Sequence, residues 1–243
     1  MIYFASDIHL REGHLTTERE FVAWLLRVSE DAEAIILGGD IFDFWFEYKR
    51  VIPMGFSRTL GTLSSLTDRG VRVIFIAGNH DMWLGDYLSR ECGLEIYTKP
   101  HIFEFGDRRV HIAHGDNLNV RKDWKLQLIN KIFRSKITFK LFSSLIHPDL
   151  ALKFGQWWSN SSRKKHPVVV DVERTDGVGV EALVDYAQSV QNVTPCDYYI
   201  YGHLHYPKVV EREGYKVLFT NDWSESPHFI KIDNEGVITL EKV

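Results

Sequence analysis

The chain has 243 residues, 44% hydrophobic and 26% charged, a composition that excludes wholesale disorder and is ordinary for a globular protein. This length allows one substantial core with an insertion, but not several independent domains. Its two cysteines are too few for a disulfide framework, and no stretch approaches the roughly 20 apolar residues that a transmembrane helix needs.

The formal net charge of −4 is unevenly distributed along the chain. Residues 119–166 hold eleven Lys and Arg but two Asp and Glu, a formal charge of +9, so the rest of the chain carries −13. A basic block in an acidic protein usually meets anions. A phosphate-rich ligand and an anionic membrane surface are the two leading interpretations.

The first residues, Met1–Asp7, have no basic start, no long apolar region and no small-residue cleavage site. We therefore expect no secretory signal and a cytoplasmic protein. The low cysteine content agrees with a reducing compartment.

Short β-branched or aromatic runs alternate along the chain with longer segments of helical spacing. The runs predict buried strands, whereas Glu18–Ser29 and Ser57–Asp68 have the spacing of helices with one apolar face. This alternation predicts a layered α/β fold. The expected strands are Ile2–Ala5, Ala34–Leu37, Val71–Ala77, Val110–Ala113, Tyr198–Tyr201 and Val217–Thr220.

The pattern changes in residues 119–167, where strand-like runs disappear and apolar residues recur every four positions. That spacing predicts helices. We therefore expect a helical cap over 119–167, inserted into a core made of residues 1–118 and 168–243. The recurring apolar residues are Trp124, Leu128, Ile132, Ile137, Leu141 and Leu145.

Side chains suited to metal binding follow the expected strands, and open α/β sheets place ligands at the carboxyl ends of strands. A pair of hard divalent ions needs about seven carboxylate, amide or imidazole ligands, with one carboxylate between the ions. Strand alternation would point the two ligands of each D-x-H or H-x-H motif the same way, and neighbouring glycines would permit unusual backbone angles and close approach of substrate. Each motif alone is weak, because an isolated His is more often structural. The candidates are Asp7, His9, Asp40, Asn79, His114, His203 and His205.

Taken together, the motifs resemble those of the calcineurin-like metallophosphoesterase family, over residues 7–205. The blocks are D-x-H from Asp7, G-D-x-x-D from Gly39, G-N-H-D from Gly78, H-G from His114 and G-H-x-H from Gly202. The resemblance implies an α/β fold with a layered β-sandwich core flanked by helices. It also implies two divalent metal ions, with Mn²⁺ as the expected metal.

In the resembling family, matching residues are divided between the two ions. The resemblance assigns Asp7, His9, Asp40 and His205 to one ion, and Asp40, Asn79, His114 and His203 to the other. Asp40 would bridge the ions, which would activate a water for attack on phosphorus. Asp43 and Asp81 are further candidates, either of which would orient a ligand from behind.

His80 follows the candidate ligand Asn79 directly. As a group that titrates near neutral pH, it is the candidate to stabilise developing charge or to protonate the leaving oxygen. A purely structural imidazole is the alternative.

Within this family, the chain looks most similar to the UDP-2,3-diacylglucosamine hydrolases of lipid A biosynthesis. The similarity lies in length, in the helical insertion after His114-Gly115 and in Asn221-Asp222-Trp223. It implies hydrolysis of the UDP-linked acylated sugar to UMP and the sugar 1-phosphate, on the anionic cytoplasmic face of the inner membrane, as a peripheral protein. Neither nucleic acid nor an obligate protein partner is expected. One departure is His80, where the resembling enzymes carry Arg.

The resemblance also places substrate contacts on the cap, together with His203. The polar candidates are Asp123, Ser161, Arg163, Lys164 and Lys165. Apolar cap residues would line an acyl cavity or rest on a membrane, unless they only pack the cap on the core. These are Trp124, Leu128, Ile132, Phe133, Phe139, Phe142, Trp157 and Trp158.

Two other functions stay open at this stage. A phosphodiesterase or phosphatase acting on a nucleotide or nucleic acid would use the basic cap to follow a phosphate backbone. A non-catalytic binding scaffold is the other alternative, and the complete set of seven candidate ligands argues against it.

Overall fold

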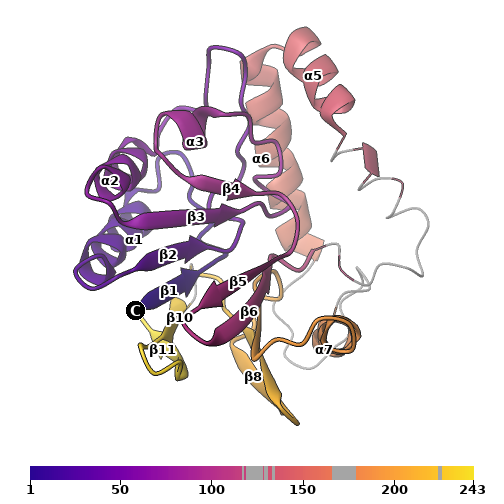
Figure 1. Ribbon diagram of the computed structural model, residues 1–243. Coiled ribbons are helices and arrows are strands. Elements are labelled where there is room, and N and C mark those ends of the chain that lie inside the picture. The colour runs from indigo at the N-terminus through magenta and orange to yellow at the C-terminus, as the bar shows by residue number, and fades with distance from the viewer. Residues whose placement is uncertain (117, 119–127, 129–130, 133–134, 166–178, 224–225) are drawn as a thin grey trace.

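The computed structural model describes residues 1–116, 118, 128, 131–132, 135–165, 179–223 and 226–243, with only the backbone described at 136, 156 and 158–165 (Figure 1). In chain order the elements are β1 (Ile2–Ala5), α1 (Leu15–Val28), β2 (Ala34–Leu37), α2 (Ser57–Asp68), β3 (Arg72–Ile76), α3 (Tyr87–Arg90), β4 (Glu95–Tyr97), β5 (His101–Phe105), β6 (Arg108–Ala113), α5 (Lys136–Leu145), α6 (Pro148–Lys165), α7 (Val180–Gln191), β7 (Tyr198–Tyr201), β8 (Lys208–Arg212), β9 (Tyr215–Phe219), β10 (His228–Ile232) and β11 (Ile238–Lys242).

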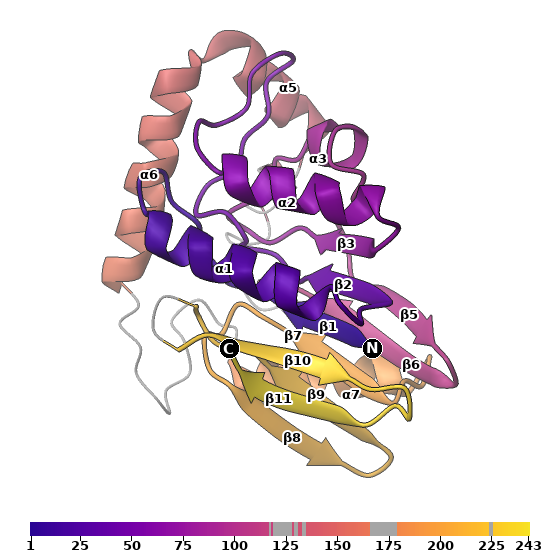
Figure 2. The same cartoon turned by 90° about the vertical axis from the view of Figure 1, so that its left-hand side faces the viewer.

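Two sheets form the centre of the molecule. The first has the order β11-β10-β1-β2-β3-β4 and is parallel from β1 to β4, and the second has the order β5-β6-β7-β9-β8. Helices α1 and α2 lie on one side of the paired sheets and α7 on the other (Figures 1 and 2). The expected fold class, a layered β-sandwich core flanked by helices, is confirmed.

Strand β1 shows why these runs read as continuously apolar. Ile2 and Phe4 belong to the core between the sheets, whereas Tyr3 and Ala5 belong to the core under α1 and α2. Because side chains alternate along a strand, a strand covered on both faces must be apolar at every position.

Helix α1 confirms the expected amphipathic spacing. Phe21, Trp24, Leu25 and Val28 are all buried against the first sheet. The helix begins at Leu15, three residues before the expected start.

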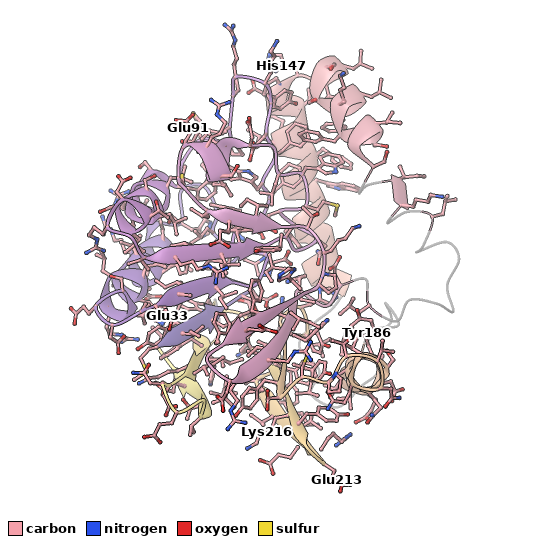
Figure 3. The ribbon with its side chains drawn as sticks, viewed as in Figure 1. Glu33, Glu91, His147, Tyr186, Glu213 and Lys216 are labelled. Carbon is pink, nitrogen blue, oxygen red and sulfur yellow. The ribbon has the colours of Figure 1, made fainter. Side chains whose placement is uncertain are left out.

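Helices α5 and α6 make up most of the described part of the expected cap region. Helix α5 begins after Ser135, whose hydroxyl accepts a hydrogen bond from the Ile137 amide. α5 packs on loops that follow β2 and β3. Phe139 and Phe142 lie with ring centroids 4.8–6.4 Å from those of Phe46 and Trp83. Figure 3 shows His147, between α5 and α6, at the opposite end of the molecule from Glu213 on the β8–β9 turn.

Candidate metal centre

The seven candidate ligands come from loops at the carboxyl ends of five strands. Asp7 and His9 follow β1, Asp40 follows β2 and Asn79 follows β3 in one sheet. His114 follows β6, and His203 and His205 follow β7 in the other sheet. Because the strands within each set are parallel, these loops gather at one edge of the paired sheets.

Six of the seven candidates fall into two compact groups. The ligand atoms of Asp7, His9 and His205 lie within 4.8 Å of one another, as do those of Asp40, His114 and His203. In the first group, His205 Nε2 lies 3.2 Å from Asp7 Oδ1 and 3.3 Å from His9 Nε2. In the second, His114 Nε2 lies 3.2 Å from Asp40 Oδ2.

The backbone at these residues is unusual. Apart from Phe56, the described non-glycine residues with positive φ are all candidate ligands. L-residues rarely adopt this left-handed conformation, and such strain concentrates at functional sites. The residues are Asp7, His9, Asp40, His203 and His205, with φ from 51° to 65°.

The expected reason for the convergence of paired ligands was wrong. Strand β1 ends at Ala5 and β7 at Tyr201, so neither Asp7 and His9 nor His203 and His205 lie within a strand. Their side chains meet because each residue takes a left-handed turn, and strand alternation plays no part.

Glycines give the carboxylates room. A Cβ on Gly78 would lie 2.2 Å from Asp40 Oδ1, and a Cβ on Gly202 would lie 2.5 Å from Asp7 Oδ2. These glycines therefore admit the candidate ligands themselves, where the sequence predicted close approach of substrate.

The protonation states of Asp7, Asp40 and His9 fit a bound cation. Burial opposes ionisation of Asp7, but a hydrogen bond with His205 lowers the pKa of Asp7 to about 2. The imidazoles of His114 and His80 likewise overcome burial and hold the pKa of Asp40 well below its usual range. Burial, and then the neighbouring His80, lower the pKa of His9 to about 4, which leaves this imidazole neutral and able to coordinate.

An orphaned polar atom gives an independent test of fit. Asn79 Oδ1 is buried without a hydrogen-bond partner among the described residues. A buried amide oxygen without a partner is destabilising unless something else satisfies it. The donor set of carboxylates, imidazoles and one amide oxygen suits a pair of divalent ions.

Groups behind the candidate imidazoles fix their orientation. His205 Nδ1 lies 3.5 Å from Asp222 Oδ2, His9 Nδ1 lies 3.6 Å from Asp43 Oδ1, and His114 Nδ1 lies 2.9 Å from the Gly38 carbonyl oxygen. Carboxylates and carbonyls commonly orient metal-binding imidazoles in this way. Sequence reasoning assigned no role to Asp222, although its position just after β9, at the same sheet edge, is the signal that would have found it.

Asp81 joins two ligand loops. Its oxygens accept from the backbone amides of Gly78, at 2.7 Å, and Ile41, at 2.9 Å. Burial and the nearby Asp40 raise its pKa to about 7.

His80 lies beside both groups. Its Nδ1 is 2.7 Å from the Asp43 carbonyl oxygen, and its Nε2 is 3.9 Å from Asp40 Oδ2. Its amide donates to Asp40 Oδ1 at 2.9 Å. The bond at Nδ1 leaves Nε2 directed toward the candidate metal centre.

Most of the expected substrate contacts cannot be placed relative to these groups. Asp123 lies outside the described residues, and Ser161, Arg163, Lys164 and Lys165 belong to α6, where the backbone alone is described. Among the apolar candidates, Phe139 and Phe142 pack on the core, whereas Leu128, Ile132 and Trp157 are exposed. Trp124 and Phe133, and the side chain of Trp158, are not described.

The fold and this arrangement of ligands define a class of protein. The model of the calcineurin-like phosphoesterase family matches residues 1–207. The chain belongs to the calcineurin-like phosphoesterases, and it is a metal-dependent hydrolase.

Two relatives with the same name are similar to this chain over nearly its whole length. A UDP-2,3-diacylglucosamine hydrolase of Porphyromonas gingivalis is 34% identical over 236 residues, which cover 91% of this chain and 90% of that one. A protein of the same name from Neisseria meningitidis is 28% identical over 248 residues, covering 99% and 98% of the two chains. Among solved structures, the match to an archaeal phosphodiesterase covers 100% of this chain and 99% of that one, at 15% identity and a TM-score of 0.49.

Within the described part of the chain, no helix is both long enough and apolar enough to span a bilayer.

Proposed function

We propose that this chain hydrolyses the pyrophosphate bond of UDP-2,3-diacylglucosamine to UMP and 2,3-diacylglucosamine 1-phosphate. The observation that carries the proposal is the convergence of two ligand groups at one sheet edge, with the buried carboxylate of Asp40 in one of them. The relatives named for this activity match more than nine-tenths of the chain, which supports the choice of substrate.

Seven residues would hold two divalent ions, for which we propose Mn²⁺. Asp7, His9 and His205 would bind one ion, Asn79, His114 and His203 the other, and Asp40 would bind both. When bound, the ions supply positive charge that lowers the pKa of a water and neutralises phosphoryl oxygens.

The chain's own groups then orient the substrate and handle protons. As a general acid, His80 would donate from Nε2 to the oxygen on which charge develops as the P–O bond breaks, while its Nδ1 contacts the Asp43 carbonyl. Asp222 and Asp43 keep the imidazoles of His205 and His9 in one orientation.

We further propose that residues 119–167 act as a cap that binds the lipid substrate. Asp123, Ser161, Arg163, Lys164 and Lys165 would meet its sugar and phosphates, with His203 at the metal edge. Neutralising Arg163, Lys164 and Lys165 is expected to raise KM for the anionic lipid while sparing a small aryl phosphodiester. An equal rise in KM for both substrates would show that these three residues do not bind the lipid substrate.

The exposed face of α5 supports a peripheral location on the cytoplasmic face of the inner membrane. Ile137, Leu141 and Leu145, spaced one turn apart, are 72%, 56% and 76% exposed, and Lys140 is exposed beside them. Apolar side chains with adjacent lysines suit an anionic bilayer surface. Leu141→Glu should release the protein from sedimenting anionic vesicles, whereas unchanged sedimentation would count against this face.

The direct experiment is to incubate the Mn²⁺-loaded chain with UDP-2,3-diacylglucosamine in detergent and to follow UMP release. Asp40→Ala should abolish both UMP release and paired metal content measured by elemental analysis, whereas the exposed Asp68→Ala should behave as the parent. Release of UMP by Asp40→Ala would contradict the mechanism.

His80 gives a specific reason to test a second substrate class. The sequence pattern by which this chain resembles the lipid hydrolases has Arg at that position. A phosphodiesterase acting on another nucleotide substrate is therefore the second candidate. Cleavage of a generic aryl phosphodiester without UMP release from the lipid would favour that alternative.

A further inference from the structure

A pocket of about 200 Å³ lies beside the candidate metal centre. Three segments enclose it: the loop after β1, the long loop after β2, and α6 through Leu152. Pockets that hold a whole drug-sized ligand have roughly 300–1,000 Å³, so this one fits part of a larger molecule.

The pocket adjoins the candidate metal ligands. Asp43 lines it, and Asp43 Oδ1 lies 3.6 Å from Nδ1 of the candidate ligand His9. Leu10, the residue after His9, lines it too. A group bound here would therefore lie next to a phosphate held at the metal centre.

Its walls divide into an apolar and a polar part. Phe44, Met54 and Phe56 contribute aromatic and thioether surface, and the polar part consists of Arg11, Glu12, His14 and Asp43. Four ionisable side chains around so small a space do not suit an acyl chain, because each would lose hydration without gaining a partner. A heterocycle with a sugar suits them well, since its ring faces are apolar and its edges carry hydrogen-bonding groups.

Arg11 is the side chain best placed to donate hydrogen bonds to the edge of such a heterocycle or to the sugar. Its Nε forms an ion pair with Asp43 Oδ2 at 3.2 Å. The side chain is 31% exposed. The planar guanidinium has five N–H donors, which leaves several for a carbonyl or hydroxyl oxygen of a ligand.

We propose that this pocket binds the nucleoside half of the substrate, with Arg11 donating to the pyrimidine or ribose oxygens. The inference rests on the proposed function, and it assigns the uridine end of the substrate to the pocket between the core loops and α6. Gly155 supports the arrangement, because a Cβ there would lie 2.3 Å from the ring of Phe44. The glycine lets α6 close the pocket against Phe44.

The test uses two esters with the same leaving group. Thymidine 5′-(p-nitrophenyl) phosphate carries a nucleoside beside phosphorus, and methyl p-nitrophenyl phosphate does not. The Mn²⁺-loaded full chain should cleave the nucleoside ester with a kcat/KM at least tenfold higher. Arg11→Gln, and independently Met54→Glu, should bring this ratio close to one whatever happens to the absolute rates.

Met54 is 71% exposed, so its substitution leaves folding intact, and the exposed Arg19→Gln serves as the matched control with the parental ratio. Calorimetric titration with UMP gives a readout independent of turnover, with at least tenfold weaker binding expected for both pocket variants. An unchanged ratio together with unchanged UMP affinity in both variants would overturn the proposal. Failure to hydrolyse the lipid with the ratio intact would reject only the proposed lipid substrate.

Discussion

Individual residues at the candidate metal centre are held in a conformation that the chain would otherwise avoid. A left-handed L-residue costs roughly 1–2 kcal/mol, and five candidate ligands share this conformation. Backbone hydrogen bonds hold them in place: the amides of Asp7 and His9 donate to the carbonyls of Gly39 and Asp40, each at 3.0 Å. The fold thus offsets local strain with contacts between ligand loops.

This strain predicts that glycine is more stabilising than alanine at position 205, the reverse of the usual order. His205→Gly should be more stable than His205→Ala by about 1 kcal/mol in urea unfolding, because only glycine adopts a positive φ without strain. At Lys140, inside α5, the order should be the ordinary one, with alanine more stable than glycine. If the alanine variant were the more stable one at both positions, the backbone at His205 would be unstrained.

His80 is the candidate proton donor to the leaving oxygen. If it donates a proton, His80→Gln should lower kcat about 10²-fold for a diester with an alkoxide leaving group, and much less for a p-nitrophenyl ester, whose leaving group needs no proton. The exposed His101→Gln supplies the control. Equal losses for both leaving groups would leave His80 with charge stabilisation or positioning alone.

At the scale of elements, the metal edge is assembled by loops that pass unusually close to one another. The backbones after β2 and β3 nearly touch, since a Cβ on Gly39 would lie 2.7 Å from the Gly78 amide nitrogen. The Asp81 carboxylate links the same two loops, because it accepts hydrogen bonds from the backbone amides of Gly78 and Ile41. Strand order therefore sets which ligands meet, and glycine sets how closely.

Gly78→Ala should disrupt this arrangement. The new Cβ would lie 2.2 Å from Asp40 Oδ1, so we expect paired metal binding and hydrolysis to fall at least tenfold. Gly61→Ala in α2 is the matched control, because nothing lies within 4 Å of its Cβ position. That control should raise the free energy of unfolding by about 0.5–1 kcal/mol. Normal metal content in Gly78→Ala would show that the close approach is unimportant.

The whole molecule also carries a pH-dependent element on the second sheet. His111 is buried among the rings of Tyr186, Tyr199 and Tyr201, and burial lowers its pKa to about 4. The unfolded chain binds this proton near pH 6.5. Between these values the unfolded state holds more protons, so stability falls as the pH falls from about 6.5 to about 4, by up to about 3 kcal/mol.

His111→Phe should flatten this part of the pH profile. The difference in unfolding free energy between variant and parent, measured in urea at pH 7 and pH 4.5, should shift in favour of the variant on acidification. His147→Gln, at an exposed histidine, should follow the parent at both values. A constant difference between His111→Phe and the parent would mean that His111 does not titrate in this range.

How much of the fold could be predicted depends on which strands are covered on both faces. β1, β2 and β7 have the predicted bounds, and β3, β6 and β9 differ by one or two residues at either end. The strands without a prediction lie at or near sheet edges, where charged residues interrupt the apolar pattern, as in Lys208–Arg212 and Ile238–Lys242. Helix α7 was also missed, although Leu183, Val184 and Ala187 are buried beneath it.

The sequence by itself determined which residues gather at the candidate metal centre, because buried parallel strands read as continuous apolar runs and the candidate ligands follow those runs directly. Only the tertiary structure decided how they face one another, since left-handed backbone at Asp7 or His205 and the reach of Asp222 to an imidazole depend on loops brought together by the sheets. The pocket beside Arg11 likewise has no signature along the chain. Its walls come from residues 10–12, 14, 43–44, 53–54, 56 and 152, which become neighbours only when the loops after β1 and β2 meet α6.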